Sequence, residues 1–101
     1  MSERAKRIAE ELRNRLRVYN DFIGLYLYGS QVSGKIIPDS DIDIVAVFKN
    51  DKNSDDDIIL PAWELEIEND TIIDFHPYSV EQLELNTFFY NEVRKGIYYA
   101  R

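Results

Sequence analysis

Two aspartates at the start of an apolar run are the residues of this chain best suited to chemistry. Asp41 and Asp43 lie two positions apart in the segment 41–48, DIDIVAVF. Successive side chains of a strand point to opposite faces, so both carboxylates should project the same way. Two like charges this close are unfavourable unless a cation or protons neutralise them. Because Mg²⁺ prefers oxygen ligands and commonly binds one or two carboxylates together with substrate phosphates, the pair predicts a site for a metal-bound nucleotide. The alternative is a solvent-exposed strand end with two aspartates that bind nothing.

A turn bracketed by glycines precedes this pair. Gly29 follows the aromatic and branched run 22–28, and Ser30 is placed to begin a short helix that Gly34 ends. A helix N-terminus offers unpaired N–H groups, and glycine lets a phosphate approach the backbone closely. We therefore predict that Gly29, Ser30 and Gly34 bind the nucleotide. An ordinary strand-to-helix turn is the alternative, but the carboxylate pair begins only twelve residues after Gly29.

A third carboxylate lies in another apolar run. Asp74 interrupts the segment 71–75, TIIDF, where an unpartnered charge would be costly to bury. If this segment pairs beside 41–48, Asp74 can face the same site, as a metal ligand or as the acceptor of a proton from an attacking hydroxyl. The alternative is an aspartate at a sheet edge that faces water. His76 is the only histidine and could contact substrate from the same face, although a lone histidine is more often structural.

Two other motifs are excluded. Asp39, Asp41 and Asp43 match the first three ligand positions of a calcium-binding EF-hand loop, but Ile44 and Asn50 occupy the positions that require Gly and Glu. The sequence contains no Gly-Lys-Ser/Thr phosphate-binding motif and no cysteine, so a Walker-type site, a disulfide and a thiolate metal site are ruled out.

The apolar periodicity predicts alternating helices and strands. Helices are expected over 3–19, 79–86 and 88–95, and strands over 22–28, 41–48, 71–78 and 97–99. Residues 58–69 fit a helix with Pro61 in its first turn, but Trp63, Leu65 and Ile67 also alternate as in a strand; we favour the helix. The run 41–48 is apolar on both faces, which is typical of a central strand. Together these elements predict a single α/β (α+β) domain over 1–101, with helices packed on a mixed sheet.

Composition narrows the class of partner. The chain has 101 residues, 45% of them apolar, which is typical of one folded domain rather than a disordered segment. No apolar run is long enough to span a membrane, and we expect a cytoplasmic protein. Residues 36–86 carry fourteen acidic and only two basic side chains. Such a charge distribution repels phosphate backbones, so bulk nucleic acid is not expected as a partner.

The motifs together resemble a known family. Gly29-Ser30 with Gly34, then Ser40-Asp41-Ile42-Asp43, then Asp74 between apolar residues, is similar to the nucleotidyltransferase superfamily that includes DNA polymerase beta, and most of all to its minimal stand-alone members. The C-terminal segment 92–99, in which a helix is expected to stop at a glycine before an aromatic strand, resembles the usual ending of that family. Val32 and Ser33 depart from it, since a small and a basic residue are common there.

The resemblance implies a nucleotidyltransferase fold and a specific chemistry. It implies two Mg²⁺ ions held by Asp41, Asp43 and Asp74, and ATP or another nucleoside triphosphate cradled by Gly29 and Ser30. It further implies transfer of a nucleoside monophosphate, AMP from ATP, to a hydroxyl of a partner protein. Many minimal members are encoded beside a small helical HEPN-type protein, and some act as antitoxins that adenylylate it.

Two other functions are compatible with the same residues. One is a non-catalytic module that binds a nucleotide or a partner protein by contact alone. The other is transfer to a small molecule of the antibiotic type, although relatives with that activity usually carry an additional domain.

Overall fold

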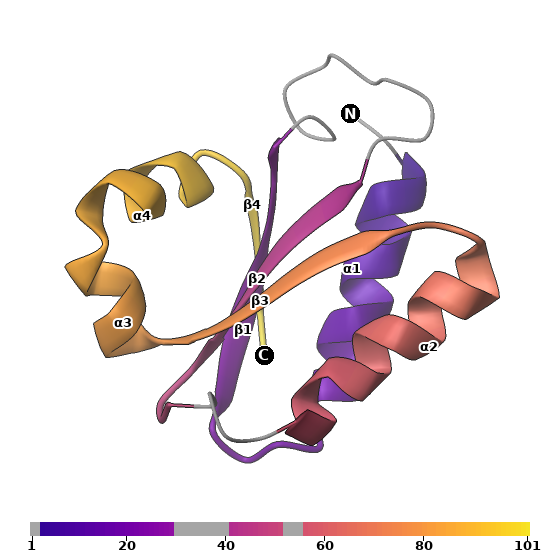
Figure 1. Ribbon diagram of the computed structural model, residues 1–101, viewed down its shortest axis with the longest axis horizontal. Helices are drawn as coiled ribbons and strands as arrows, with labels where there is room; N and C mark the ends of the chain where they lie inside the picture. Colours follow the sequence, from indigo (N-terminus) through magenta and orange to yellow (C-terminus); the bar gives the residue numbers. More distant parts are fainter. Residues whose placement is uncertain (1–2, 30–40, 52–55) are drawn as a thin grey trace.

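The computed structural model describes residues 3–29, 41–51 and 56–101. Four strands form one sheet, and helices cover both of its faces (Figure 1). Along the chain the elements are α1 (Glu3–Leu16), β1 (Phe22–Tyr28), β2 (Ile42–Phe48), the 3₁₀ helix η2 (Asp56–Ile59), α2 (Leu60–Asn69), β3 (Ile73–Ser79), α3 (Val80–Leu85), α4 (Thr87–Val93) and β4 (Ile97–Ala100). The predicted α+β fold with a mixed sheet is confirmed.

The sheet has the strand order β3-β2-β1-β4. β1 is antiparallel to both β2 and β4, whereas β2 and β3 are parallel. The parallel pair is possible because the connection from β2 to β3 crosses over through α2, as a parallel connection requires. This arrangement places the start of β2 beside the start of β3, at one end of the sheet.

Both faces of the sheet are packed. α1 and α2 cover one face, and α3 and α4 cover the other (Figure 1). β2 contributes to both cores, with Ile42, Ile44, Ala46 and Phe48 on the α1/α2 side and Val45 and Val47 on the α3/α4 side. The prediction that this strand is central and apolar on both faces is therefore confirmed.

Local capping signals explain several element boundaries. Ser79 caps α3: its hydroxyl accepts from the N–H of Gln82, and the side chain of Gln82 accepts from the N–H of Ser79. This reciprocal pair is a capping box, and it begins the helix that was expected over 79–86. Residues 60–69 form the helix that we favoured over a strand, with Pro61 in its first turn, where a missing N–H is tolerated.

Several element boundaries differ from the sequence-based prediction by a few residues, most of all the end of the first helix. The first helix ends at Leu16 rather than near residue 19. The chain turns there, with the N–H of Tyr19 donating to the carbonyl of Leu16, and the guanidinium of Arg101 donates to the carbonyls of Arg17 and Tyr19 just beyond the helix. The strand expected over 71–78 runs from Ile73 to Ser79 and includes Pro77. Pro77 is tolerated there because β3 is an edge strand, where a proline without an N–H need not break a ladder bond.

Candidate functional site

Asp43 and Asp74 lie side by side on neighbouring parallel strands. They are direct register partners between β2 and β3, so their side chains extend from the same face of the sheet. Each follows an apolar residue that packs into the opposite core, Ile42 before Asp43 and Ile73 before Asp74. The alternation of the two strands thus turns both carboxylates toward the α3/α4 face. The pairing on which Asp74 depended in the sequence argument is present.

Asp41 is less closely associated with the other two carboxylates. It is exposed and lies immediately before β2. Its charge raises the pKa of Asp43, so it lies within electrostatic range of that carboxylate. Within the described residues, no group of three or more His, Cys, Asp or Glu side chains is arranged to hold one metal ion. The structure therefore brings two of the three predicted carboxylates together and leaves the third nearby.

The electrostatic environment of Asp43 is unfavourable to its charge. Burial, followed by the charges of Asp74 and Asp41, raises the pKa of Asp43 above its ordinary value, while His76 acts in the opposite direction. Because the pKa is higher in the folded state, this group stabilises the fold at acidic pH. That contribution is lost as the pH rises through the interval between the unfolded and folded pKa values. At neutral pH the ionised carboxylate has an electrostatic cost that a bound cation would relieve.

Gly29 contacts this carboxylate directly. It has a φ of +81°, in the left-handed region that favours glycine, and a Cβ built there would clash with Oδ2 of Asp43. Gly29 follows the last residue of β1, which pairs with Asp43 across the sheet. A glycine is therefore required both by the backbone conformation and by the position of the Asp43 side chain. The other predicted nucleotide-binding residues, Ser30 and Gly34, lie outside the described residues.

Gly29→Ala is expected to destabilise the protein by about 1–2 kcal/mol from backbone strain alone, with an additional cost from the clash with Asp43. Urea denaturation of the single variant and of the same change in an Asp43→Ala background separates the two terms. Without the carboxylate, only the backbone term should remain, so Gly29→Ala should cost less there. An equal cost in both backgrounds would contradict the direct contact.

A histidine and a group of aromatic rings lie on the same sheet face. Nε2 of His76 is 3.0 Å from Oδ1 of Asp74, and the His76 ring is stacked 6.4 Å from that of Tyr78. Phe89 of α4 packs against both Tyr78 and Tyr28, with ring centroids 5.7 and 6.0 Å apart. His76 thus contacts Asp74 directly, although a structural role was the commoner expectation for a lone histidine.

Tyr28 is the site residue that the sequence argument missed. It pairs with Asp43 across β1 and β2, and burial together with the charges of Asp43 and Asp74 raises its pKa to about 12. Its phenol therefore stays protonated at neutral pH and can donate a hydrogen bond. The sequence did contain one signal for Tyr28: it lies two residues after Tyr26, near the end of a predicted alternating strand that Gly29 follows. Which residue it would face depended on the register with β2.

The donor set at this end of the sheet fits a hard divalent cation. Asp43 and Asp74 supply adjacent carboxylate oxygens, the ligands that Mg²⁺ prefers, and burial followed by the charges of Asp74 and Asp41 raises the pKa of Asp43. Asp41 is close enough to add a third carboxylate to this field. Oxygen donors without thiolates are unsuited to softer metals.

The fold and this site together define a class of protein. A mixed sheet that presents paired aspartates from two parallel strands, beside a glycine turn at the end of a third, is the arrangement expected of a nucleotidyltransferase. The sequence matches the family described as polymerase beta, nucleotidyltransferase, over residues 10–98, and the chain belongs to that family.

This family is generally dependent on nucleoside triphosphates and divalent metal ions. Comparison with curated proteins and comparison with solved structures each gave no significant match. Within the described part of the chain, no helix is sufficiently long and apolar to cross a membrane.

Proposed function

We propose that this protein is a Mg²⁺-dependent nucleotidyltransferase that moves AMP from ATP onto a hydroxyl group of a partner protein. The observation that carries the proposal is the register pairing of Asp43 with Asp74, beside the positive-φ Gly29. In a family of nucleotidyltransferases, a carboxylate pair in this position supports a role in binding the metal and the triphosphate.

The residues of the chain have separate roles in this proposal. Asp41, Asp43 and Asp74 would hold two Mg²⁺ ions, which supply neutralisation of the charge on the triphosphate and on the departing pyrophosphate. Gly29 leaves room for a phosphate next to the backbone, with Ser30 and Gly34 completing the binding turn. Asp74 would also accept the proton of the attacking hydroxyl, and His76, which is 3.0 Å from its carboxylate, would orient it.

The proposal of a protein acceptor rests on the resemblance of the chain to minimal nucleotidyltransferases. A small helical HEPN-type protein is the proposed acceptor, in the manner of a two-gene toxin–antitoxin pair. Transfer to a small molecule of the antibiotic type is a weaker proposal on the same ground.

A labelling experiment tests the reaction. The protein is incubated with Mg²⁺, the partner encoded beside it, and ATP labelled on either the α- or the γ-phosphate. Nucleotidyl transfer should label the partner only from α-labelled ATP, and a chelator of divalent metals should abolish the labelling. Labelling from γ-labelled ATP would instead indicate phosphoryl transfer and contradict the proposal.

One observation favours a second candidate, a non-catalytic binding module of the same fold. Asp41 is exposed, and within the described residues the carboxylates do not form a three-ligand metal group. Calorimetric titration with ATP and Mg²⁺ separates the two candidates. Tight binding of the partner protein with no affinity for nucleotide would favour the binding module.

A further inference from the structure

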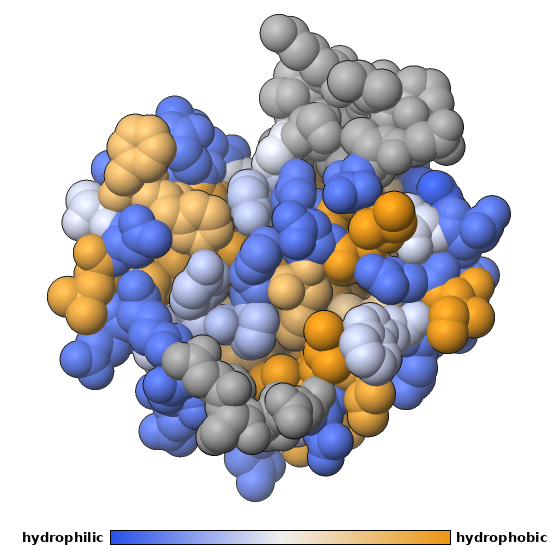
Figure 2. Space-filling view, in the orientation of Figure 1, coloured by the Kyte–Doolittle hydropathy of each residue, from blue (hydrophilic) through white to orange (hydrophobic). Residues whose placement is uncertain are grey.

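The outward face of α2 carries large apolar side chains that are exposed to solvent. Leu60, Trp63 and Ile67 are 43%, 51% and 83% exposed. The spacing of three and four residues places the three helical side chains on one face. The buried residues of the same helix, Ala62 and Leu65, face the core. We call Leu60, Trp63 and Ile67 the α2 stripe; Figure 2 shows apolar surface interspersed with hydrophilic surface over this helix.

The α2 stripe lies in an entirely acidic part of the chain. Residues 53–93 contain eleven Asp or Glu and no Lys or Arg. Within α2 the charged residues are Glu64, Glu66 and Glu68, and the carboxylates of Glu64 and Glu68 remain 65% and 53% exposed. The border of the stripe is therefore negatively charged.

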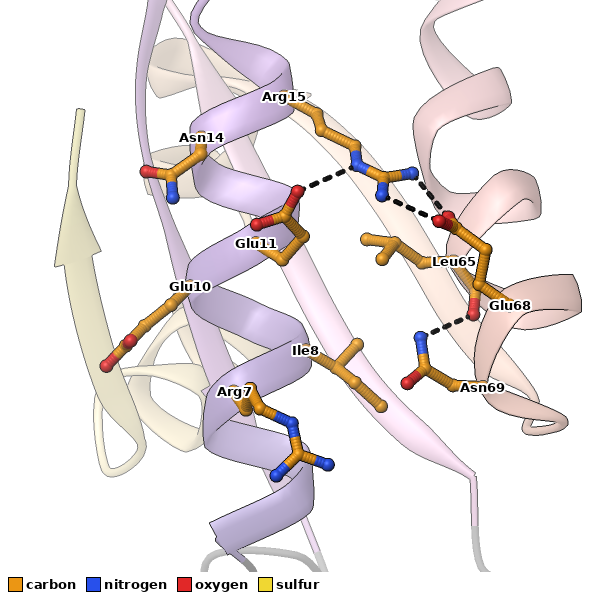
Figure 3. A pocket seen from close by; sticks show the side chains of 9 residues that line it. All are labelled: Arg7, Ile8, Glu10, Glu11, Asn14, Arg15, Leu65, Glu68 and Asn69. Carbon is orange, nitrogen blue, oxygen red and sulfur yellow. Dashed lines mark hydrogen bonds and ion pairs between the residues drawn. The ribbon is translucent and has the colours of Figure 1, made fainter.

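Arg15 of α1 contacts this border from the inner side of the helix. It donates to Glu11 of its own helix at 3.1 Å and, across the pocket between α1 and α2, to Glu68 at 2.7 Å (Figure 3). It also donates to Glu64 at 3.4 Å, and the bonds to Glu64 and Glu68 join the two helices to one another. They hold the guanidinium in the α1/α2 pocket, so a partner that approaches the stripe from outside meets carboxylates bordering an apolar surface.

A second copy of the chain does not complement this surface. Face-to-face pairing of two α2 helices would bring Glu64 and Glu68 of each copy together, and the chain already has a net charge of −7. Like charges brought together at an interface disfavour association. The negative charge around the α2 stripe therefore favours a basic partner.

We propose that the α2 stripe is the docking surface for an α-helix of a partner protein, with apolar side chains at three- and four-residue spacing and Lys or Arg along their flanks. A helix laid against α2 would cover Trp63, a residue type that commonly contributes most of the energy of an interface. The flanking cations would pair with Glu64 and Glu68 and increase the rate of encounter. This docking requires no nucleotide, so it stands or falls separately from the proposed transferase activity.

The test uses a defined probe, an 18-residue synthetic helical peptide of leucine and lysine with leucines at the same spacing. The comparison peptide has the same composition in scrambled order. Trp63 is the only tryptophan of the chain, so a blue shift of its emission reports burial of the stripe. The dissociation constant is measured by the fluorescence anisotropy of the labelled peptide at two salt concentrations.

The structure offers a matched pair of variants. Ile67 and Phe88 are both 83% exposed, on α2 and α4, so Ile67→Lys and Phe88→Lys make the same charge change at equal exposure. Ile67→Lys is expected to weaken binding of the patterned peptide at least tenfold, and Phe88→Lys to change it less than threefold. Equal weakening by the two variants, equal binding of the scrambled peptide, or an unshifted Trp63 emission would each overturn the docking proposal.

Discussion

Asp43→Asn is expected to reduce nucleotidyl transfer by about 10²–10³-fold and, at neutral pH, to raise the free energy of unfolding. A carboxylate that binds metal stabilises transition-state charge by several kcal/mol, and each 1.36 kcal/mol is tenfold in rate. Stability should increase because burial and the charges of Asp74 and Asp41 raise the pKa of Asp43, which makes its ionised form unfavourable. The measurements are α-phosphate labelling of the partner and urea denaturation at pH 7.

The pH dependence of the stability difference between the wild type and Asp43→Asn provides a further check. The stability advantage of Asp43→Asn should shrink as the pH falls through the raised pKa of Asp43, because the wild-type carboxyl then becomes protonated and neutral. Mg²⁺ should stabilise the wild-type protein more than the variant.

Asp57→Asn is the matched control for Asp43→Asn, since Asp57 is exposed on η2 and the charge change is the same. It should leave transfer unchanged and stability within about 0.5 kcal/mol. Transfer at the wild-type rate in Asp43→Asn would remove Asp43 from the proposed metal site.

Phe48→Ala is expected to destabilise the fold by about 3–5 kcal/mol, the usual cost of removing a large aromatic side chain from a core. Phe48 is fully buried at the end of β2, with its ring 5.5 Å from that of Phe22 and 6.3 Å from that of Tyr19. It thus joins the central strand to the segment between α1 and β1. Urea denaturation followed by circular dichroism measures the loss.

Phe88→Ala is the control for this core prediction, because it makes the same chemical change at a side chain that is 83% exposed. Its effect should stay within about 0.5 kcal/mol. Similar losses for the two variants would mean that Phe48 does not contribute to stability through burial.

Local features of the fold were predictable from the sequence where they depend on interactions between residues close together in the chain. The capping box of Ser79 and Gln82 began α3, and a stretch apolar on both faces became the central strand β2. These signals depend on hydrogen bonds and periodicity within a few residues, so they can be recognised without knowledge of the rest of the molecule. The contacts just beyond the end of α1 were less predictable, because they are made by Arg101 from the opposite end of the chain.

The sequence by itself determined which residues could bind a metal-bound nucleotide, since carboxylate spacing and a glycine turn are properties of residue type and order. Only the tertiary structure decided which of them meet. The parallel register of β2 and β3 places Asp74 against Asp43, and the antiparallel register of β1 adds Tyr28 and Gly29. Strand order and register arise from packing both faces of the sheet at once, a constraint that no short segment of the chain contains.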